Sequence, residues 1–93
     1  MNETVIETMD ILQEECAEVI QAVSKCRRFG LNNIKPSKQK TNLECLEEEI
    51  GDLMAMVDIL VEKNILSIDH LEVAKQAKKE KLKVWSKIYE ELT

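Results

Sequence analysis

Apolar residues recur at alternating spacings of four and three over the first part of the chain, from about residue 3 to residue 28. They are Val5, Met9, Leu12, Cys16, Val19, Val23 and Cys26. Side chains at these spacings lie on one face of an α-helix. Gly30 follows Phe29 and can adopt the left-handed conformation that closes a helix. The pattern therefore predicts a long first helix that ends at Phe29-Gly30.

A second apolar pattern begins after residues 31–40, where two asparagines, Pro36 and three lysines predict an exposed loop. The segment Thr41-Asn42-Leu43-Glu44 then matches a capping box, in which a threonine and a glutamate three residues later exchange hydrogen bonds. The apolar residues that follow at helical spacing are Leu43, Leu46, Ile50, Leu53, Val57 and Leu60. We expect a second helix that runs to about Lys63.

A third helix is predicted after Asn64, with Ser67 or Asp69 as its cap and an end near Leu92. An extra short helical turn fits Ile65 to Ile68. The apolar residues expected on the third helix are Leu71, Ala74, Leu82, Trp85, Ile88 and Tyr89. We therefore expect an all-α fold and one domain over residues 1–93. Its three main helices would form a bundle that is completed by homo-oligomerisation.

The composition supports this picture. Two glycines and one proline in 93 residues favour long helices over strands and turns. A domain of this size buries only about 60–65% of its unfolded surface, which makes self-association plausible. No apolar run approaches the ~20 residues of a membrane span, and the three cysteines lack a Cys-x-x-Cys spacing. We expect a cytoplasmic protein with reduced thiols and no membrane partner.

The charges are unevenly distributed. Thirteen Lys and Arg against eighteen Asp and Glu give a net charge of −5, which disfavours nucleic acid as a partner. Residues 1–69 carry a net charge of −7, whereas residues 70–93 carry +2. An anionic ligand would therefore need cations near the first part of the chain.

Four acidic residues lie beside the apolar stripes of the first two predicted helices. A helix turns by about 100° per residue, which places Glu15 and Glu18 roughly 60° and 120° to one side of Leu12 in the first stripe. On the second helix, Glu49 and Asp52 lie about 40° and 100° to the same side of Leu53. If the helices pack antiparallel through these stripes, four carboxylates converge on an oxygen-only site suited to Mg²⁺ or Mn²⁺.

The alternative is that these acids only solvate the helix faces, where a pair of like charges costs a few tenths of a kcal/mol. We expect this role for five glutamates of these helices, namely Glu3, Glu7, Glu47, Glu48 and Glu62. A cluster at a partly buried interface is more costly, and a bound cation or a raised carboxyl pKa would relieve it.

The acidic motifs also resemble those of a known family. Glu14-Glu15-Cys16-Ala17-Glu18 followed by Glu49-Ile50-Gly51-Asp52 resembles the Glu-Glu-x-x-Glu and Glu-x-x-Asp signature of MazG-like nucleoside triphosphate pyrophosphohydrolases, members of the all-α pyrophosphatase superfamily. Three flanking segments resemble compact single-domain members, including phage-encoded ones. They are Arg28-Phe29-Gly30-Leu31, Thr41-Asn42-Leu43 and the Lys-x-x-Lys-Leu-x-x-Trp segment from Lys78 to Trp85.

The resemblance implies hydrolysis of a nucleoside triphosphate, with deoxynucleotides favoured, to the monophosphate and pyrophosphate. It implies a magnesium site, in which Mn²⁺ can substitute, with Glu15, Glu18, Glu49 and Asp52 as ligands. Glu14 would orient or activate the attacking water, so that the catalytic group is Glu14, Glu15 and Glu18. The resemblance also implies a homo-oligomer, with a tetramer slightly favoured over a dimer.

Substrate contacts are assigned to cationic, aromatic and amide side chains. The lysines of the third helix could neutralise the phosphates, Phe29 and Trp85 could stack on the base, and Asn42 could read its polar edge. The loop lysines Lys35, Lys38 and Lys40 are weaker candidates. The assigned residues are Lys75, Lys78, Lys81, Phe29, Asn42 and Trp85. Each also has a structural explanation: a solvated basic face, core packing or a helix cap.

Two other functions remain open at this point. The chain could be a catalytically silent helical protein that oligomerises or binds a partner through its helices. It could instead be a related hydrolase of phosphoribosyl-nucleotides or nucleoside diphosphates. Product analysis distinguishes the second alternative from triphosphate hydrolysis. Mg²⁺ binding distinguishes the silent helical protein from a metal-dependent hydrolase.

Overall fold

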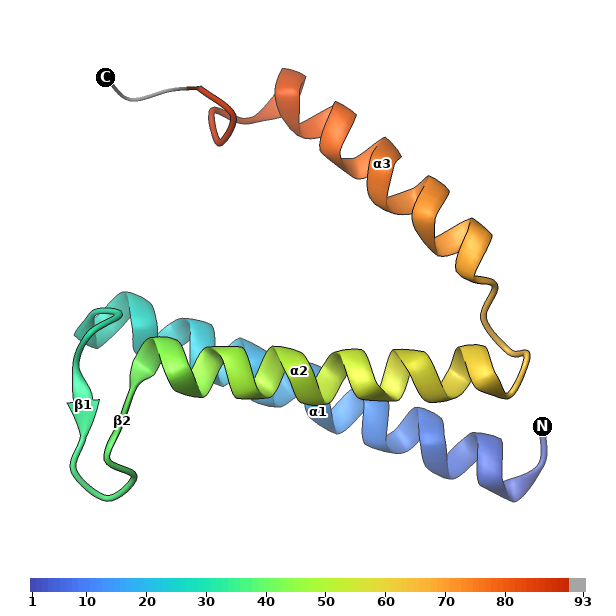
Figure 1. The fold of residues 1–93 in the computed structure, drawn as a ribbon, viewed down its shortest axis with the longest axis horizontal. Coiled ribbons are helices and arrows are strands. Elements are labelled where there is room, and N and C mark those ends of the chain that lie inside the picture. Colours follow the sequence, from blue (N-terminus) through green and yellow to red (C-terminus); the bar gives the residue numbers. More distant parts are fainter. Residues whose placement is uncertain (91–93) are drawn as a thin grey trace.

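Three helices and a small hairpin make up the computed structural model, which describes residues 1–90. The elements are α1 (Glu3–Phe29), β1 (Ile34–Lys35), β2 (Lys40–Thr41), α2 (Asn42–Glu62) and α3 (Ile68–Trp85). The strands pair antiparallel, with Ile34 opposite Thr41 (Figure 1). The all-α class and the three main helices are confirmed. The sequence did not predict the hairpin at the expected loop, because two-residue strands are too short to give a periodic pattern.

The core lies between α1 and α2, which run antiparallel side by side (Figure 1). Leu60 is only 1% exposed, and Val5 and Ala22 are also buried. Cys16 and Val23 were expected on the core face but are exposed. The reason is that one partner helix covers only part of the apolar stripe of α1.

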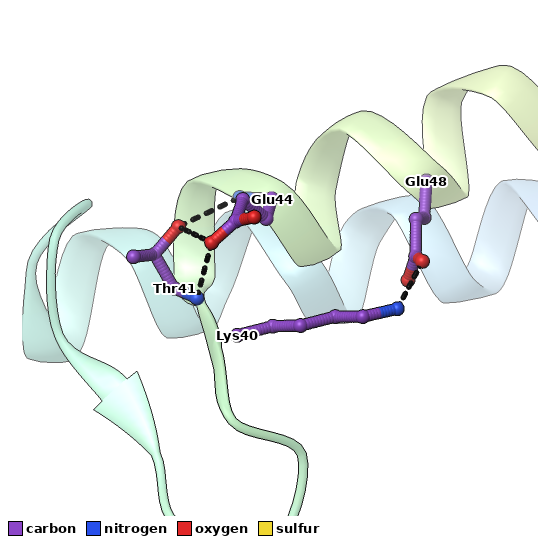
Figure 2. A network of polar contacts seen from close by, with 4 residues as sticks. All are labelled: Lys40, Thr41, Glu44 and Glu48. Carbon is purple, nitrogen blue, oxygen red and sulfur yellow. Dashed lines mark hydrogen bonds and ion pairs between the residues drawn. The ribbon is translucent and has the colours of Figure 1, made fainter.

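The ends of these two helices follow the sequence signals. Asn2 Oδ1 accepts a hydrogen bond from Val5 N at 2.8 Å at the start of α1. Gly30 ends α1 with a positive φ of 93°, but its ψ of 154° is extended and not the left-handed helical value expected. At the start of α2 the capping box is confirmed: Thr41 Oγ1 accepts from Glu44 N, and Glu44 Oε1 accepts from Thr41 N, each at 3.0 Å (Figure 2).

Several bonds tie the start of α2 to the end of α1 and to the hairpin. Asn42 N donates to Asn33 O at 3.0 Å, and Asn42 Nδ2 donates to Gly30 O at 2.9 Å. The Lys40 ammonium pairs with the Glu48 carboxylate, nearly two turns into α2 (Figure 2). The hairpin is thereby fixed against both helices at this end of the pair.

The third helix begins as predicted and ends earlier. Ser67 Oγ accepts from His70 N at 3.3 Å, which confirms Ser67 as the cap. The preceding residues form a bend and not an extra short helix, with Asn64 at a positive φ of 60°. α3 ends at Trp85 because the backbone of Ser86 is extended, with φ −146° and ψ 173°. Ser86 N and Ser86 Oγ both donate to Leu82 O, at 3.0 and 2.7 Å, and so cap this end of the helix. The expected end at Leu92 lies outside the described residues.

α3 projects from the far end of α2 and packs along neither α1 nor α2 (Figure 1). Trp85 was expected in the core, but it is 82% exposed, and Val84 is 75% exposed. The radius of gyration is 16.3 Å, whereas a compact chain of this length has about 12 Å. Completion of the bundle by further copies of the chain stays a prediction. No helix in residues 1–90 is both long and apolar enough to cross a membrane.

Candidate functional site

Three carboxylates meet where the middle of α1 faces the middle of α2. One oxygen from each of Glu15, Glu49 and Asp52 lies within 4.8 Å of an oxygen from each of the other two. Glu15 and Glu49 are half-buried and Asp52 is exposed. Two oxygens on one Mg²⁺ are at most about 4.2 Å apart, because each bond is about 2.1 Å. Small side-chain movements would therefore suffice to bring all three onto one ion.

The antiparallel packing of the helices produces this convergence. Glu49 and Asp52 are three residues apart and therefore lie on the same face of α2, one turn from each other. Glu15 lies on the facing helix, beside the apolar stripe that packs on α2. The structure thus brings together three of the four side chains that the sequence assigned to the metal.

The environment of Glu15 distinguishes this cluster from solvated surface acids. Glu15 Oε2 is buried and has no hydrogen-bond partner among the described residues. Loss of solvation raises the pKa of Glu15 above 4.5, and the charges of Asp52, Glu49, Glu18 and Glu14 raise it further. An unpartnered carboxylate oxygen among other carboxylates is costly unless a cation neutralises it. Because the donors are all carboxylate oxygens, the site fits a hard ion such as Mg²⁺ or Mn²⁺.

The other two predicted acidic residues lie next to the cluster. Glu14 and Glu18 are exposed, and neither contributes to the group of three close oxygens. Both are near enough for their charges to raise the pKa of Glu15. Glu18 also lines a pocket that adjoins the cluster. These positions leave both carboxylates available to contact water or substrate.

The adjoining pocket lies between the second half of α1, the hairpin loop and the first turns of α2. Its lining residues are Glu18, Gln21, Ala22, Lys25, Lys38, Asn42, Cys45 and Glu49. Glu49 belongs to both the pocket and the carboxylate cluster, so the two are continuous. Asn42, predicted to contact substrate, is placed here. Lys25 and Gln21 were missed, although Lys25 follows Glu18 by seven residues and so lies on the same face of α1.

The remaining predicted substrate residues lie elsewhere in the single chain. Phe29 is 54% exposed and lies beneath the Arg28 guanidinium, 4.9 Å from ring centre to carbon. Lys75 forms an ion pair with Glu72 at 2.7 Å on the surface of α3. Within residues 1–90, the lining of the pocket and the carboxylate cluster include no residue of α3. Lys75, Lys78, Lys81 and Trp85 are therefore not brought to the cluster by their own chain.

Comparison with known proteins identifies one family. The family model for the MazG nucleotide pyrophosphohydrolase domain matches residues 3–84, which is most of the chain. No curated protein and no solved structure matched the chain. The matched region contains all three helices almost to the end of α3, together with the carboxylate cluster and the adjoining pocket.

Proposed function

Because the chain belongs to the MazG family of nucleotide pyrophosphohydrolases, we propose that it uses Mg²⁺ to hydrolyse nucleoside triphosphates to the monophosphate and pyrophosphate. The observation that carries this proposal is the cluster of Glu15, Glu49 and Asp52, with its buried and unpartnered Glu15 oxygen. A silent helical protein would have no use for such a costly group at the interface between α1 and α2.

Glu15, Glu49 and Asp52 are the proposed ligands, and Glu18 joins them from the next turn of α1. The chemistry that a bound ion supplies is neutralisation of phosphate oxygens and a lowered pKa for the attacking water. Mn²⁺ prefers the same oxygen donors and is expected to substitute. Half-burial of Glu15 and Glu49 would strengthen their attraction to a bound cation, because less water screens them.

The water attacks the α-phosphorus, the bond from that phosphorus to the bridging oxygen breaks, and pyrophosphate leaves. Glu14 is the carboxylate that would orient this water and accept its proton, since it adjoins the cluster and is not one of the four proposed ligands. Glu14 lies about 100° around α1 from Glu15 and so approaches from the neighbouring face.

We further propose that the substrates are deoxynucleoside triphosphates and that Asn42 and the aromatic residues Phe29 and Trp85 contact the base. The enzyme would act as a homo-oligomer, with a tetramer favoured over a dimer. The exposed apolar face of α3 supports such an assembly, because a second copy would cover it. A neighbouring copy is also the natural source of Lys75, Lys78 and Lys81 at the site. The three free cysteines agree with a cytoplasmic location.

The test is pyrophosphate release from a panel of ribo- and deoxynucleoside triphosphates with Mg²⁺. The variants are Asp52→Asn and, as a matched control, Glu47→Gln, an exposed acid on the same helix outside the cluster. We expect monophosphate and pyrophosphate as products and a loss of at least about a hundredfold in Asp52→Asn alone. Hydrolysis of only diphosphates or phosphoribosyl-nucleotides would assign a related reaction. No turnover of any nucleotide would contradict the proposal.

A further inference from the structure

We propose that Lys25 and Lys38 form the subsite that binds the phosphate tail of the substrate. This inference rests on the proposed function and assigns a role to two residues on the side of the cluster away from α3. Both lysines line the pocket that shares Glu49 with the carboxylate cluster. A triphosphate held at the cluster would enter this small pocket, of about 40 Å³, with a terminal phosphate group.

The charges of the pocket suit an anion once a cation is bound next to it. Its lining contains two lysines and two glutamates, Glu18 and Glu49, so its formal charge is balanced. The combined site of the pocket and the cluster has a formal charge of about −2, because the acids Glu15, Glu18, Glu49 and Asp52 outnumber the two lysines. A divalent ion at the cluster would bring this charge to about zero, which removes the net repulsion of an anion.

Neither lysine is committed to a carboxylate within the described residues. The ion pairs found there engage Lys40, Lys75 and Lys83. Lys25 has no acidic residue three or four positions away on α1, where its neighbours are Gln21, Ala22, Arg28 and Phe29. The lysines of α3 differ, because Lys75 and Lys83 each pair with a glutamate three residues earlier. The ammonium groups of Lys25 and Lys38 thus remain available to a ligand.

The start of α2 cannot supply the phosphate contacts by its backbone amides. Such helix ends often bind phosphate through free N–H groups. Here Asn42 N donates to Asn33 O, Leu43 N to Leu31 O and Glu44 N to Thr41 Oγ1. The pocket must therefore bind an anion through side chains, and among its lining residues only the two lysines are cationic.

The hairpin holds Lys38 close to the pocket. Lys38 lies in the turn between β1 and β2, next to Gln39, whose φ of 52° reverses the chain direction. The hairpin is fastened to α2 by the Lys40–Glu48 ion pair and by the capping box (Figure 2). Lys25 comes from α1, so the two ammonium groups approach the pocket from two different elements. A phosphate chain bound between them would be clamped between α1 and the hairpin loop.

The test measures binding of inorganic tripolyphosphate by calorimetry, with and without Mg²⁺, and KM and kcat for the best triphosphate substrate. The variants are Lys25→Ala, Lys38→Ala, the double variant, the conservative Lys25→Arg and, as a control, Lys63→Ala at the exposed C-terminal end of α2. Lys25→Ala and Lys38→Ala should each weaken tripolyphosphate binding about tenfold, typical of one lost charge-assisted contact. KM should rise by a similar factor with a smaller change in kcat, while Lys25→Arg and Lys63→Ala stay near the native values.

Unchanged tripolyphosphate binding in the double variant would overturn the inference, as would the absence of tripolyphosphate binding to the native chain. A double variant that loses affinity for nucleosides but keeps it for tripolyphosphate would assign the pocket to the base and also overturn it. Lysine-dependent tripolyphosphate binding without pyrophosphate release from any nucleotide would support the subsite and contradict the proposed function. Both lysines are exposed, so circular dichroism should show intact helices in every variant.

Discussion

The α1–α2 pair and α3 are built from similar amphipathic patterns, yet they end in different surroundings. Leu60 of α2 is 1% exposed, whereas Trp85 at the equivalent apolar face of α3 is 82% exposed. Their charges differ as well. The pair brings three carboxylates together without an ion-pair partner, while Lys75 and Lys83 of α3 are neutralised by glutamates of their own helix. Helical periodicity predicts that a face will be covered, but it does not say whether the same chain covers it.

This difference shows which parts of the candidate site one chain forms by itself and which parts would need a second copy of the chain. The carboxylate cluster and its adjoining pocket are formed within the α1–α2 pair and the hairpin. Any contribution of α3 to substrate binding needs a second copy, because its residues do not reach the cluster of their own chain. The proposed metal chemistry should therefore depend on the pair, and the proposed α3 contacts on assembly.

The largest expected effect is on packing of the pair. Leu60→Ala should lower the free energy of unfolding by about 2–5 kcal/mol, because it leaves a cavity in the packed interface between α1 and α2. Val84→Ala, at an exposed position of α3, should change it by no more than about 0.5 kcal/mol in dilute solution. Urea unfolding at several protein concentrations measures both. A large, concentration-dependent effect of Val84→Ala would show that α3 is buried in an assembly.

The helix caps provide a smaller comparison between the same regions. Thr41→Ala removes a capping box in which both hydrogen bonds are formed, and it should cost about 1 kcal/mol of global stability. Ser67→Ala removes the single cap bond of α3. We expect it to lower helix content without moving the main unfolding transition, because α3 is not packed on the pair. Circular dichroism and urea unfolding distinguish these outcomes, and equal shifts of the main transition would contradict them.

The smallest expected effect is a pH dependence confined to the pair. Loss of solvation raises the pKa of Glu15 above its ordinary value of 4.5, so the folded chain binds this proton more tightly than the unfolded chain. Stability of the metal-free protein should therefore fall as the pH rises from 4.5 through the raised pKa. Glu15→Gln should remove this decline, and Mg²⁺ should restore stability to the native chain at neutral pH. Parallel pH profiles of the two proteins in a chelator would contradict the assignment.

Much of the fold was predictable because its signals are local. The threonine and glutamate of the capping box, Ser67 and Gly30 mark helix ends through bonds between residues close in sequence. The early end of α3 was missed because it depends on the extended backbone of one residue, Ser86, which no periodic pattern reveals. The exposure of Trp85 was missed because burial depends on a partner surface that lies far away in the sequence or on another chain.

The candidate site also contains residues that the sequence predicts and residues that it does not. Glu15, Glu49 and Asp52 could be predicted, since helix geometry places them beside stripes that must pack together. Lys25 and Lys38 could not be assigned with equal ease. Lys25 shares a face of α1 with Glu18, but no pattern in the sequence places the loop that carries Lys38 beside that face. Their pocket exists only because Asn42 ties the start of α2 to Gly30 at the end of α1 and the hairpin folds over the junction.

The most direct test of the central claim is binding of Mn²⁺ in place of Mg²⁺, followed by the electron paramagnetic resonance signal of the free ion. The proteins are the native chain, Glu15→Gln, Asp52→Asn and the control Glu47→Gln. The native chain and Glu47→Gln should bind Mn²⁺ with similar affinity, and the two cluster variants should lose about tenfold or more. Equal binding by all four proteins, or no binding by the native chain, would contradict a metal site between α1 and α2.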